Sequence, residues 1–296
     1  MNYIITGSLG HVGRPLAAQL IKAGHSVTVV SSNPERKARI ESMGAEPAIG
    51  TVEDVGFLTG IFKGADALFT MVPPNYTGSD WKEYIARIGR NYAEAITSSG
   101  VRHVVNLSSI GAHMHEKCGP VSGLHLVEHT LNAIHGVHVR HLRAGFFYTN
   151  FLNSIGMIRS QGVMGGNYGE KTLMVLVHPS DIADEAAKEL QDTTALGRGF
   201  RYIASDEKTT DEIATILGKA IGKPELRWVD RSDKETYEGM VQAGMPDETA
   251  RNYTEMGAAM RSGEMEEHYF SNRPVMAGWR RFEAFATEFA AAYGAS

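Results

Sequence analysis

The chain has 296 residues, of which 43% are hydrophobic and 21% charged, and its formal net charge is −5. This balance leaves no basic surplus for nucleic acid or an anionic membrane, so a small molecule is the expected partner. The single cysteine, Cys118, excludes an internal disulfide and a cysteine-rich metal site. No run of about 18 apolar residues could span a bilayer, and no charged leader precedes the first strand, so a cytoplasmic protein is expected.

The first stretch of the chain combines an apolar strand, spaced glycines and a helix. Residues 2–6 form the strand, glycines follow as G-x-x-G-x-x-G, and residues 15–23 are amphipathic. Such glycines permit a tight turn, let backbone N–H groups approach a phosphate, and let the helix pack on the strand. The pattern predicts a dinucleotide site, although a plain strand-to-helix turn that needs positive φ would also contain glycine. The residues expected to bind the cofactor here are Gly7, Ser8, Leu9, Gly10, His11, Val12 and Gly13.

Further strands and helices alternate along the first half of the chain. The strands read as continuous apolar runs, which is typical of strands buried on both faces. The predicted strands are 25–30, 45–49, 66–72, 101–107 and 137–142, and the predicted helices are 33–44, 53–62, 79–98 and 120–133. This alternation predicts an α/β fold with a doubly wound Rossmann parallel sheet. Residues 1–150 are therefore the expected NAD(P)-binding domain.

The second half of the chain is less regular. Residues 146–173 are rich in glycine, asparagine and aromatic residues with weak periodicity, which predicts a substrate loop or lid. Strands at 172–177 and 199–204 are expected to complete the Rossmann domain, with a helix at 180–191 between them. Thr209 or Thr210, with Glu212, opens another helix in capping-box style.

Residues 205–296 are expected to be mainly helical and, with 146–173, to form a smaller substrate-binding part. Four aromatic residues near the end of the chain are spaced so that they bury one face of a helix, and we interpret them as core. They are Trp279, Phe282, Phe285 and Phe289.

The segment after the second strand indicates which cofactor is preferred. An NAD site usually has an acid here that holds the ribose 2′-hydroxyl, whereas this chain has Ser31, Ser32 and Asn33, followed by Arg36 and Lys37. A 2′-phosphate needs hydrogen-bond donors and positive charge, so the segment predicts NADP(H) in preference to NAD(H). The alternative is that the two cations lie on a solvated helix face.

Two later strand ends are expected at the same crevice, because ligands of open α/β sheets bind beyond the carboxyl ends of the strands. Met71, Val72 and Pro73 end the fourth strand, and Ser108 and Ser109 end the fifth. These segments are predicted to line the ribose and the nicotinamide.

With these segments in place, the chain resembles the NmrA-like group of atypical short-chain dehydrogenase/reductases, which includes quinone reductases, isoflavone-type reductases and NADP-sensing regulators. The matching pieces extend to about residue 230. They include residues 6–13, Asn33-Pro34 with Lys37, 44–50, 72–74, 105–109, 127–131, 142–150, 181–183 and 210–214.

The chain also departs from the family pattern. Ser32 stands where an arginine is common, and Thr51 stands where an acid is usual. Reductases of the wider superfamily pair a serine near the end of the fifth strand with Tyr-x-x-x-Lys, but those two slots hold Val121 and His125. The resemblance then implies Ser109 and His125 as the catalytic candidates, with His125 orienting the ribose or donating a proton. His125 could instead be a helix residue with an ordinary hydrogen bond.

One motif competes with this interpretation. His125 to His129 read H-x-x-E-H, the ligand order of one class of zinc proteases. A catalytic zinc needs a third protein ligand and an open position, and this helix lies between two sheet strands, so no metal is expected. Five further histidines lack ligand spacing and are interpreted as structural. They are His113, His115, His135, His138 and His141.

The resemblance implies an NADP(H)-dependent oxidoreductase that reduces a quinone or a similar conjugated carbonyl. Quinones accept a hydride with little help from a proton donor, which is compatible with the absence of the tyrosine that donates a proton in other reductases. Phe146, Phe147 and Tyr148 are expected to wall the nicotinamide end. The alternative is a non-catalytic redox sensor that binds NADP(H) and acts through a protein partner. Exposed helices of the C-terminal part offer a surface for a homodimer.

Overall fold

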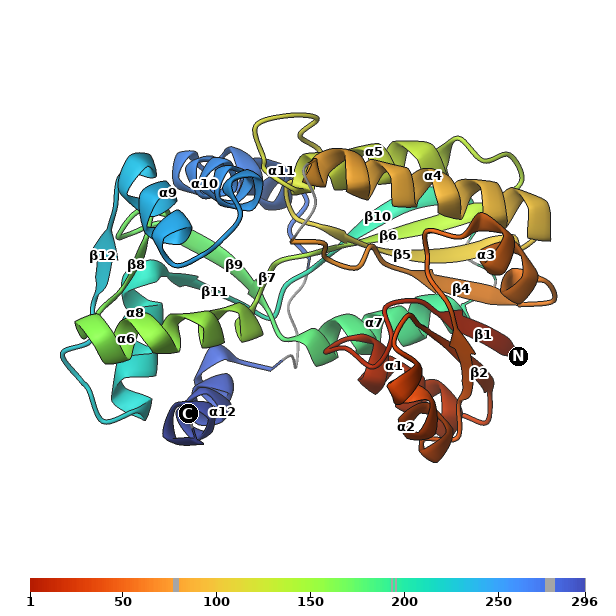
Figure 1. Cartoon of the computed structure of the whole chain (residues 1–296), viewed down its shortest axis with the longest axis horizontal. Coiled ribbons are helices and arrows are strands. Elements are labelled where there is room, and N and C mark those ends of the chain that lie inside the picture. The colour runs from red at the N-terminus through yellow and green to blue at the C-terminus, as the bar shows by residue number, and fades with distance from the viewer. Residues whose placement is uncertain (77–79, 193, 195, 275–279, 296) are drawn as a thin grey trace.

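The computed structural model describes residues 1–76, 80–192, 194, 196–274 and 280–295. Its centre is a parallel seven-stranded sheet in the order β10-β6-β5-β4-β1-β2-β3 (Figure 1). The predicted doubly wound Rossmann sheet is therefore confirmed. Its strands are β1 (Asn2–Ile5), β2 (Ser26–Ser31), β3 (Glu46–Ile49), β4 (Ala67–Thr70), β5 (His103–Ser109), β6 (His138–Ala144) and β10 (Arg198–Ile203).

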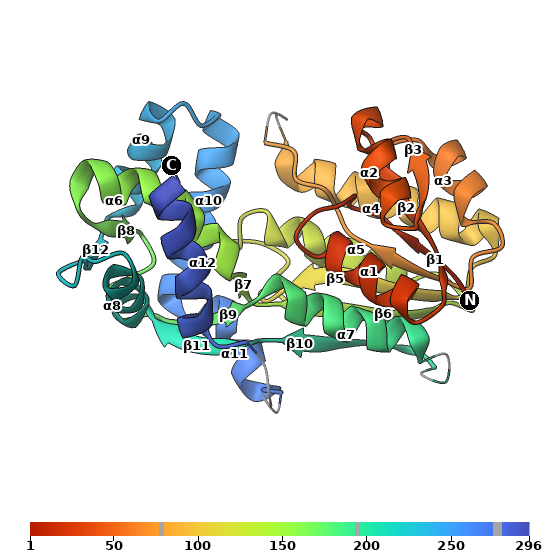
Figure 2. The same cartoon turned by 90° about the horizontal axis from the view of Figure 1, so that it is seen from below.

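Helices cover both faces of this sheet, and each layer has its own hydrophobic core. The helices of the first layer are α1 (Gly13–Lys22), α2 (Lys37–Ser42), which follows the 3₁₀ turn η1 (Pro34–Arg36), and α7 (Pro179–Gln191). The helices of the second layer are α3 (Val55–Phe62), α4 (Trp81–Ser99) and α5 (Val121–Asn132). In the view from below, α1 and α7 run side by side (Figure 2).

Local sequence explains where several of these helices begin and end. Asp80 caps α4 by accepting a 2.9 Å hydrogen bond from the backbone N–H of Glu83, and Gly100 ends the helix in the left-handed region. The predicted start of α4 at Ser79 lies outside the described residues. In α1, Leu16 and Leu20 are fully buried, and each contributes about 1.5–3 kcal/mol relative to an exposed position.

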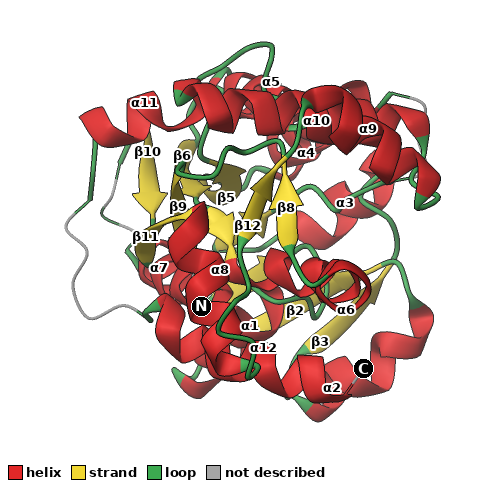
Figure 3. Cartoon of the chain, turned by 90° about the vertical axis from the view of Figure 1, so that its left-hand side faces the viewer, coloured by secondary structure: helices red, strands yellow, loops and turns green. Residues whose placement is uncertain are grey.

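The rest of the chain forms a smaller part beyond the carboxyl edge of the sheet. Two small sheets, β11-β9-β7 and β12-β8, lie there (Figure 3). Their strands are β7 (Phe146–Phe147), β8 (Met164–Gly166), β9 (Leu173–Val177), β11 (Asp206–Thr209) and β12 (Trp228–Asp230). The accompanying helices are η2 (Tyr148–Ser154), α6 (Ile155–Gln161), α8 (Thr210–Ala220), α9 (Asp233–Gln242), α10 (Asp247–Ser262), α11 (Glu264–Ser271) and α12 (Phe282–Ala295).

This part differs from the sequence expectation in two ways, and one strand of the central sheet is also shifted. Residues 146–173 contain η2, α6, β7 and β8 in place of one long loop, because Phe151 and Ile158 are buried and hold short elements in place. Of the two strands expected to complete the Rossmann sheet, β10 joins it and β9 pairs instead with β11 and β7. The fifth strand begins and ends two residues later than predicted. Thr209 is the cap of α8, with a full capping box to Glu212.

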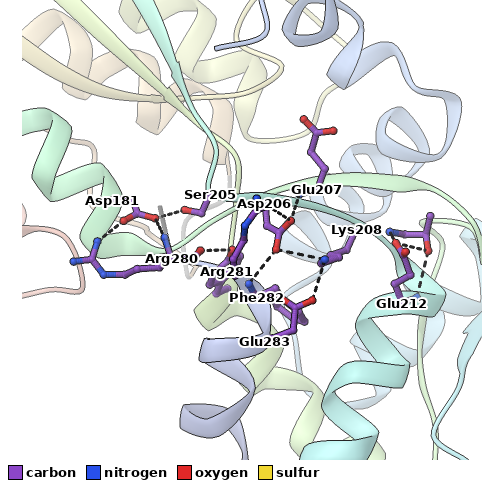
Figure 4. A network of polar contacts seen from close by, with 12 residues as sticks. Asp181, Ser205, Asp206, Glu207, Lys208, Glu212, Arg280, Arg281, Phe282 and Glu283 are labelled. Carbon is purple, nitrogen blue, oxygen red and sulfur yellow. Dashed lines mark hydrogen bonds and ion pairs between the residues drawn. The ribbon is translucent and has the colours of Figure 1, made fainter. Parts of the chain in front are cut away.

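Two buried acids, Asp206 and Asp181, hold the start of the C-terminal helix α12 by hydrogen bonds (Figure 4). Asp206 accepts a 3.1 Å hydrogen bond from the backbone N–H of Phe282, and Asp181 of α7 accepts one from the backbone N–H of Arg280. Phe282, Phe285 and Phe289 are buried in the core of this part, as predicted, while Trp279 lies outside the described residues. Within the described part of the chain, no helix is long and apolar enough to cross a membrane.

Candidate functional site

The glycine-rich loop between β1 and α1 has the tight geometry that its sequence predicts. Gly7 has φ +91°, and a Cβ on it would lie 2.1 Å from Sδ of Met71. A Cβ on Gly13 would lie 2.3 Å from the backbone oxygen of Ser8. At Gly10 the nearest atom to such a Cβ is 3.4 Å away, and the residue is exposed. The loop is thus closely packed at its two ends and open to a ligand in its middle.

The loop is joined to the end of β2 by side chains. The Ser8 hydroxyl donates to Ser31 Oγ at 3.0 Å, and Arg36 Nη1 donates to Ser8 Oγ at 3.2 Å. The backbone N–H of Asn33 also donates to Ser31 Oγ, at 3.2 Å. This brings a guanidinium and two hydroxyls to one side of the loop. The group is suited chemically to hold a phosphate.

The other residues that follow β2 are exposed to solvent. Ser32, Arg36 and Lys37 are all exposed, and Asn33 uses its side-chain oxygen to cap η1 at the backbone N–H of Glu35. Glu35 lies in the first turn of that helix, where a negative charge is favourable.

The end of β4 is fixed to the same loop by a buried tyrosine. The Tyr92 hydroxyl of α4 donates to the backbone oxygen of Met71 at 2.6 Å and lies 3.0 Å from Thr6 Oγ1. Thr6 Oγ1 in turn accepts from the backbone N–H of Met71 at 3.0 Å. Burial raises the pKa of Tyr92, so the phenol stays a neutral donor. Met71, Val72 and Pro73 are partly exposed just beyond this anchor.

At the end of β5, the two neighbouring serines have different surroundings. Ser108 is buried and donates to Glu128 Oε1 of α5 at 2.6 Å, while Arg143 Nη2 of β6 donates to Glu128 Oε2 at 2.6 Å. Burial opposes ionisation of Glu128, but the hydrogen bonds and charge of Arg143 outweigh it and hold its pKa below the usual value. Ser108 is therefore tied to a buried ion pair.

Ser109 is half-buried, lies beside Ala144 in the sheet register, and points to the opposite face of the strand from Ser108. His125 Nδ1 donates instead to the backbone oxygen of Ala112 at 2.9 Å. Among the described residues, no hydrogen bond joins Ser109 to His125. The two catalytic candidates lie on consecutive elements, β5 and α5, but they are not hydrogen-bonded to each other.

The H-x-x-E-H residues adopt other roles. The His125 and His129 rings stack with centroids 5.6 Å apart, and Glu128 is turned inward to Arg143. In the part of the chain that the structure describes, no three His, Cys, Asp or Glu side chains gather to hold a metal.

The three aromatic residues after β6 separate into two groups. Phe146 and Phe147 are half-buried at the carboxyl edge of the sheet. Tyr148 is fully buried, packs edge-on against Phe282 and donates to the backbone oxygen of Arg280 at 2.9 Å. Its ring belongs to the core of the C-terminal part, because the chain turns into η2 at this residue.

The structure also brings together aromatic residues that the sequence does not single out, since Tyr168 meets Phe146, and Tyr76 and Tyr253 both meet Trp81. Tyr76 follows β4, Tyr168 follows β8, and Tyr253 lies on α10. They come from segments almost 180 residues apart, and Tyr253 lies where the family resemblance has thinned, so no local pattern marked them.

Comparison with known proteins agrees with this geometry. Residues 7–144 match a family model described as NAD(P)H-binding. A ketoreductase of Stigmatella aurantiaca is 33% identical over 69 residues, which is 23% of this chain and 21% of that protein. An uncharacterised protein of Schizosaccharomyces pombe is 36% identical over 58 residues, or 20% of each chain. These matches thus span about a fifth of the curated relatives.

Solved structures match along almost the whole chain. An NADPH-dependent quinone oxidoreductase from Escherichia coli, complexed with NADPH, has a TM-score of 0.82 at 19% identity, covering 97% of this chain and 99% of that one. Triphenylmethane reductase from Citrobacter sp., complexed with NADP(H), has 0.81 at 21%, covering 97% and 99%. A nucleoside-diphosphate-sugar epimerase from Staphylococcus aureus has 0.82 at 17%, covering 97% and 100%. At these identities the likeness establishes a shared fold.

Proposed function

We propose that the protein is an NADP(H)-dependent oxidoreductase, because residues 7–144 match an NAD(P)H-binding family model and the fold is shared with an NADPH-dependent quinone oxidoreductase. Its acceptor is a quinone or a similar conjugated carbonyl. The observation that carries the proposal is the group formed by Ser8, Ser31 and Arg36 beside the glycine-rich loop. The bound cofactor supplies a hydride, and the residues of this chain hold and orient it.

The preference for NADP(H) rests on this group of donors. Arg36 and Lys37 are exposed, so they are accessible to a 2′-phosphate, and the second strand lacks the acid that would bind a 2′-hydroxyl. Ser8 and Ser31 add hydroxyl donors at the same place. A charge-assisted hydrogen bond contributes about 1.5–3 kcal/mol, which corresponds to roughly 10- to 150-fold in affinity.

The test compares NADPH and NADH affinities of the wild type with those of Arg36→Ala plus Lys37→Ala. We expect the double variant to lose at least about tenfold in NADPH affinity and little in NADH affinity. Arg39→Ala is the matched control, because Arg39 is an exposed cation on the next turn. Equal affinities of the wild type for both cofactors, unchanged by the double substitution, would refute the preference.

The proposed acceptor follows from the residues at the end of the crevice where the nicotinamide is expected. Val121 and His125 replace the tyrosine and lysine of other reductases, and His125 is hydrogen-bonded to the backbone of Ala112. Phe146 and Phe147 are half-buried aromatic residues at the same edge. An aromatic wall with weak acid assistance favours a planar acceptor that takes hydride readily.

The activity is tested by mixing the protein with NADPH and a panel of small quinones and following the loss of reduced-nicotinamide absorbance. We expect oxidation well above the uncatalysed rate, with Phe146→Ala raising KM for the quinone. Absence of oxidation by a protein that binds NADPH tightly would rule out the enzyme.

A second candidate function is a redox sensor that binds NADP(H) without turnover and controls a protein partner. The observation favouring it is that Ser108 and His125 both make hydrogen bonds to other groups, and among the described residues no hydrogen bond joins Ser109 to His125. The sensor predicts tight NADPH binding, no oxidation with any quinone, and a partner whose affinity differs between NADPH and NADP⁺.

A further inference from the structure

Tyr92 closes a ring of hydrogen bonds between the first residues beyond β1 and β4. The Tyr92 side chain of α4 is fully buried, and its hydroxyl donates to the backbone oxygen of Met71 at 2.6 Å. The backbone N–H of Met71 donates to Thr6 Oγ1 at 3.0 Å, and Thr6 Oγ1 lies 3.0 Å from the Tyr92 oxygen. Each proton is used once when the Thr6 hydroxyl donates to Tyr92. One phenol thus holds the two strands together at the point where both leave the sheet.

The side chain of Met71 extends this ring to the glycine-rich loop. A Cβ on Gly7 would lie 2.1 Å from Sδ of Met71 and 2.6 Å from its Cγ, so the thioether rests directly on the turn. Because Tyr92 holds the backbone of Met71, it also determines where this thioether lies. The same phenol lies next to Thr6, the residue immediately before Gly7. Tyr92 therefore acts on the turn from both sides of the contact.

The next residue of the loop is held from a different strand. The backbone N–H of Ser8 donates to the backbone oxygen of Val30 at 3.0 Å, and its hydroxyl donates to Ser31 Oγ at 3.0 Å. In the sheet, β1 lies between β4 and β2. The ring around Tyr92 thus fixes the β4 side of the loop, where the nicotinamide is expected. The contacts of Ser8 fix the β2 side, where Arg36 would meet the 2′-phosphate.

We propose that Tyr92 is a positioning residue, which sets the nicotinamide half of the cofactor through Met71 and the glycine turn. A fully buried side chain has no surface to offer a ligand, so its effect must pass through its neighbours. Met71, Val72 and Pro73 are partly exposed just beyond the ring and provide that surface. The inference rests on the proposed reductase function and adds a residue that the glycine pattern does not contain.

The test uses Tyr92→Phe in the full chain, which removes one hydroxyl and keeps the ring. Without this donor the end of β4 is free to shift, so we expect NADPH affinity and kcat each to fall about tenfold. KM for the quinone should stay within about twofold. Affinity for 2′-AMP, which carries the 2′-phosphate but no nicotinamide, should also stay within about twofold. The fluorescence emission of bound NADPH should move to longer wavelength, because the nicotinamide becomes more exposed to water.

A second variant of the same ring makes the test independent of the first. Thr6→Val keeps the branched shape and removes the hydroxyl, so it should reproduce the changes in NADPH affinity and emission. If the hydroxyls act as one unit, the double variant should lose little more than either single variant. Tyr3→Phe is the matched control, because Tyr3 is a fully buried tyrosine of β1 whose hydroxyl faces Met1 Sδ at 3.1 Å. It should leave NADPH affinity, emission and kcat unchanged.

Should Tyr92→Phe fail to fold, Thr6→Val carries the test. Wild-type values of NADPH affinity, emission and kcat in both variants would overturn the inference and leave the reductase standing. Equal losses of affinity for NADPH and 2′-AMP would also overturn it, because they would indicate a general loosening of the domain. A wild type that binds NADPH without turnover would refute the reductase, whereas the affinities and the emission would still decide the role of Tyr92.

Discussion

Gly13 illustrates how one residue controls the cofactor loop. A Cβ at this position would lie 2.3 Å from a backbone oxygen, which cannot move aside as a flexible side chain could. Gly13→Ala should therefore displace the loop, lowering the free energy of unfolding of the ligand-free protein by about 1–3 kcal/mol and weakening NADPH binding. Chemical denaturation and NADPH titration measure the two effects.

Gly10→Ala is the control for this prediction. Its added methyl group meets only an oxygen at 3.4 Å, so the ligand-free stability should change by less than about 0.5 kcal/mol. NADPH affinity should still fall, because the methyl group occupies the open middle of the loop. If both variants lost equal stability, the close packing of Gly13 would not be the cause.

His141 is a buried residue whose protonation opposes folding. Its Nδ1 lies 3.2 Å from the amide nitrogen of Asn106, and its Nε2 lies 3.1 Å from Asn132 Oδ1. The neutral ring accepts from one amide and donates to the other, whereas a protonated ring would direct an N–H at an NH₂ group. Burial lowers the pKa of His141 to about 4.

Between pH 6.5 and 4 the unfolded chain thus binds a proton that the folded chain does not, so stability must fall as pH is lowered through this window. The contribution of His141 to this loss is on the order of 3 kcal/mol. We expect His141→Asn to flatten the dependence of unfolding free energy on pH in this range. The exposed His135→Asn should retain the wild-type slope. A wild-type slope in His141→Asn would show that other groups cause the acid sensitivity.

At the scale of elements, Asp206 holds helix α12 in its position. This acid is 3% exposed and accepts from the backbone N–H of Phe282 at 3.1 Å and from Arg281 at 3.2 Å (Figure 4). Asp206→Asn should weaken these contacts and lower the free energy of unfolding by about 1–3 kcal/mol. Because Tyr148 packs on Phe282, hydrogen exchange should rise in both α12 and η2.

Glu283→Gln is the matched control, since Glu283 is mostly exposed and pairs with Lys208 at 3.0 Å. An exposed ion pair contributes no more than about 1 kcal/mol, so exchange in η2 should not change. Faster exchange confined to α12 in Asp206→Asn would show that η2 is held independently.

At the scale of the whole molecule, the two parts should unfold together. Tyr253 packs against both cores, and α10 is joined to the Rossmann domain at Tyr76 and Lys82. We expect tryptophan fluorescence and far-ultraviolet circular dichroism to give coincident denaturation curves. NADPH at about 100 times its Kd should add roughly 2.7 kcal/mol to the free energy of unfolding. Two separate transitions would show that α10 does not couple the parts.

Much of the Rossmann domain could be predicted because its signals are local. Glycine spacing and apolar runs each act within a few residues, so they specify the loop and the strands directly. The Thr209 capping box does the same for the start of α8 in the smaller part. The absence of an acid at the end of the second strand and the two cations that follow it are also features of one short stretch of sequence. These features were sufficient to predict the sheet and an NAD(P)H-binding domain.

Only the tertiary structure decided which distant side chains meet. Ser108 and Ser109 are neighbours in the chain, yet the alternation of the strand sends one to the Glu128–Arg143 ion pair and the other to the opposite face. Tyr148 follows two half-buried phenylalanines but enters the core, because α12 returns from over 130 residues away to cover it. Tyr76 and Tyr253 both come to lie against Trp81 for the same reason. Contacts of this kind depend on how separately folded elements pack, and no local periodicity encodes them.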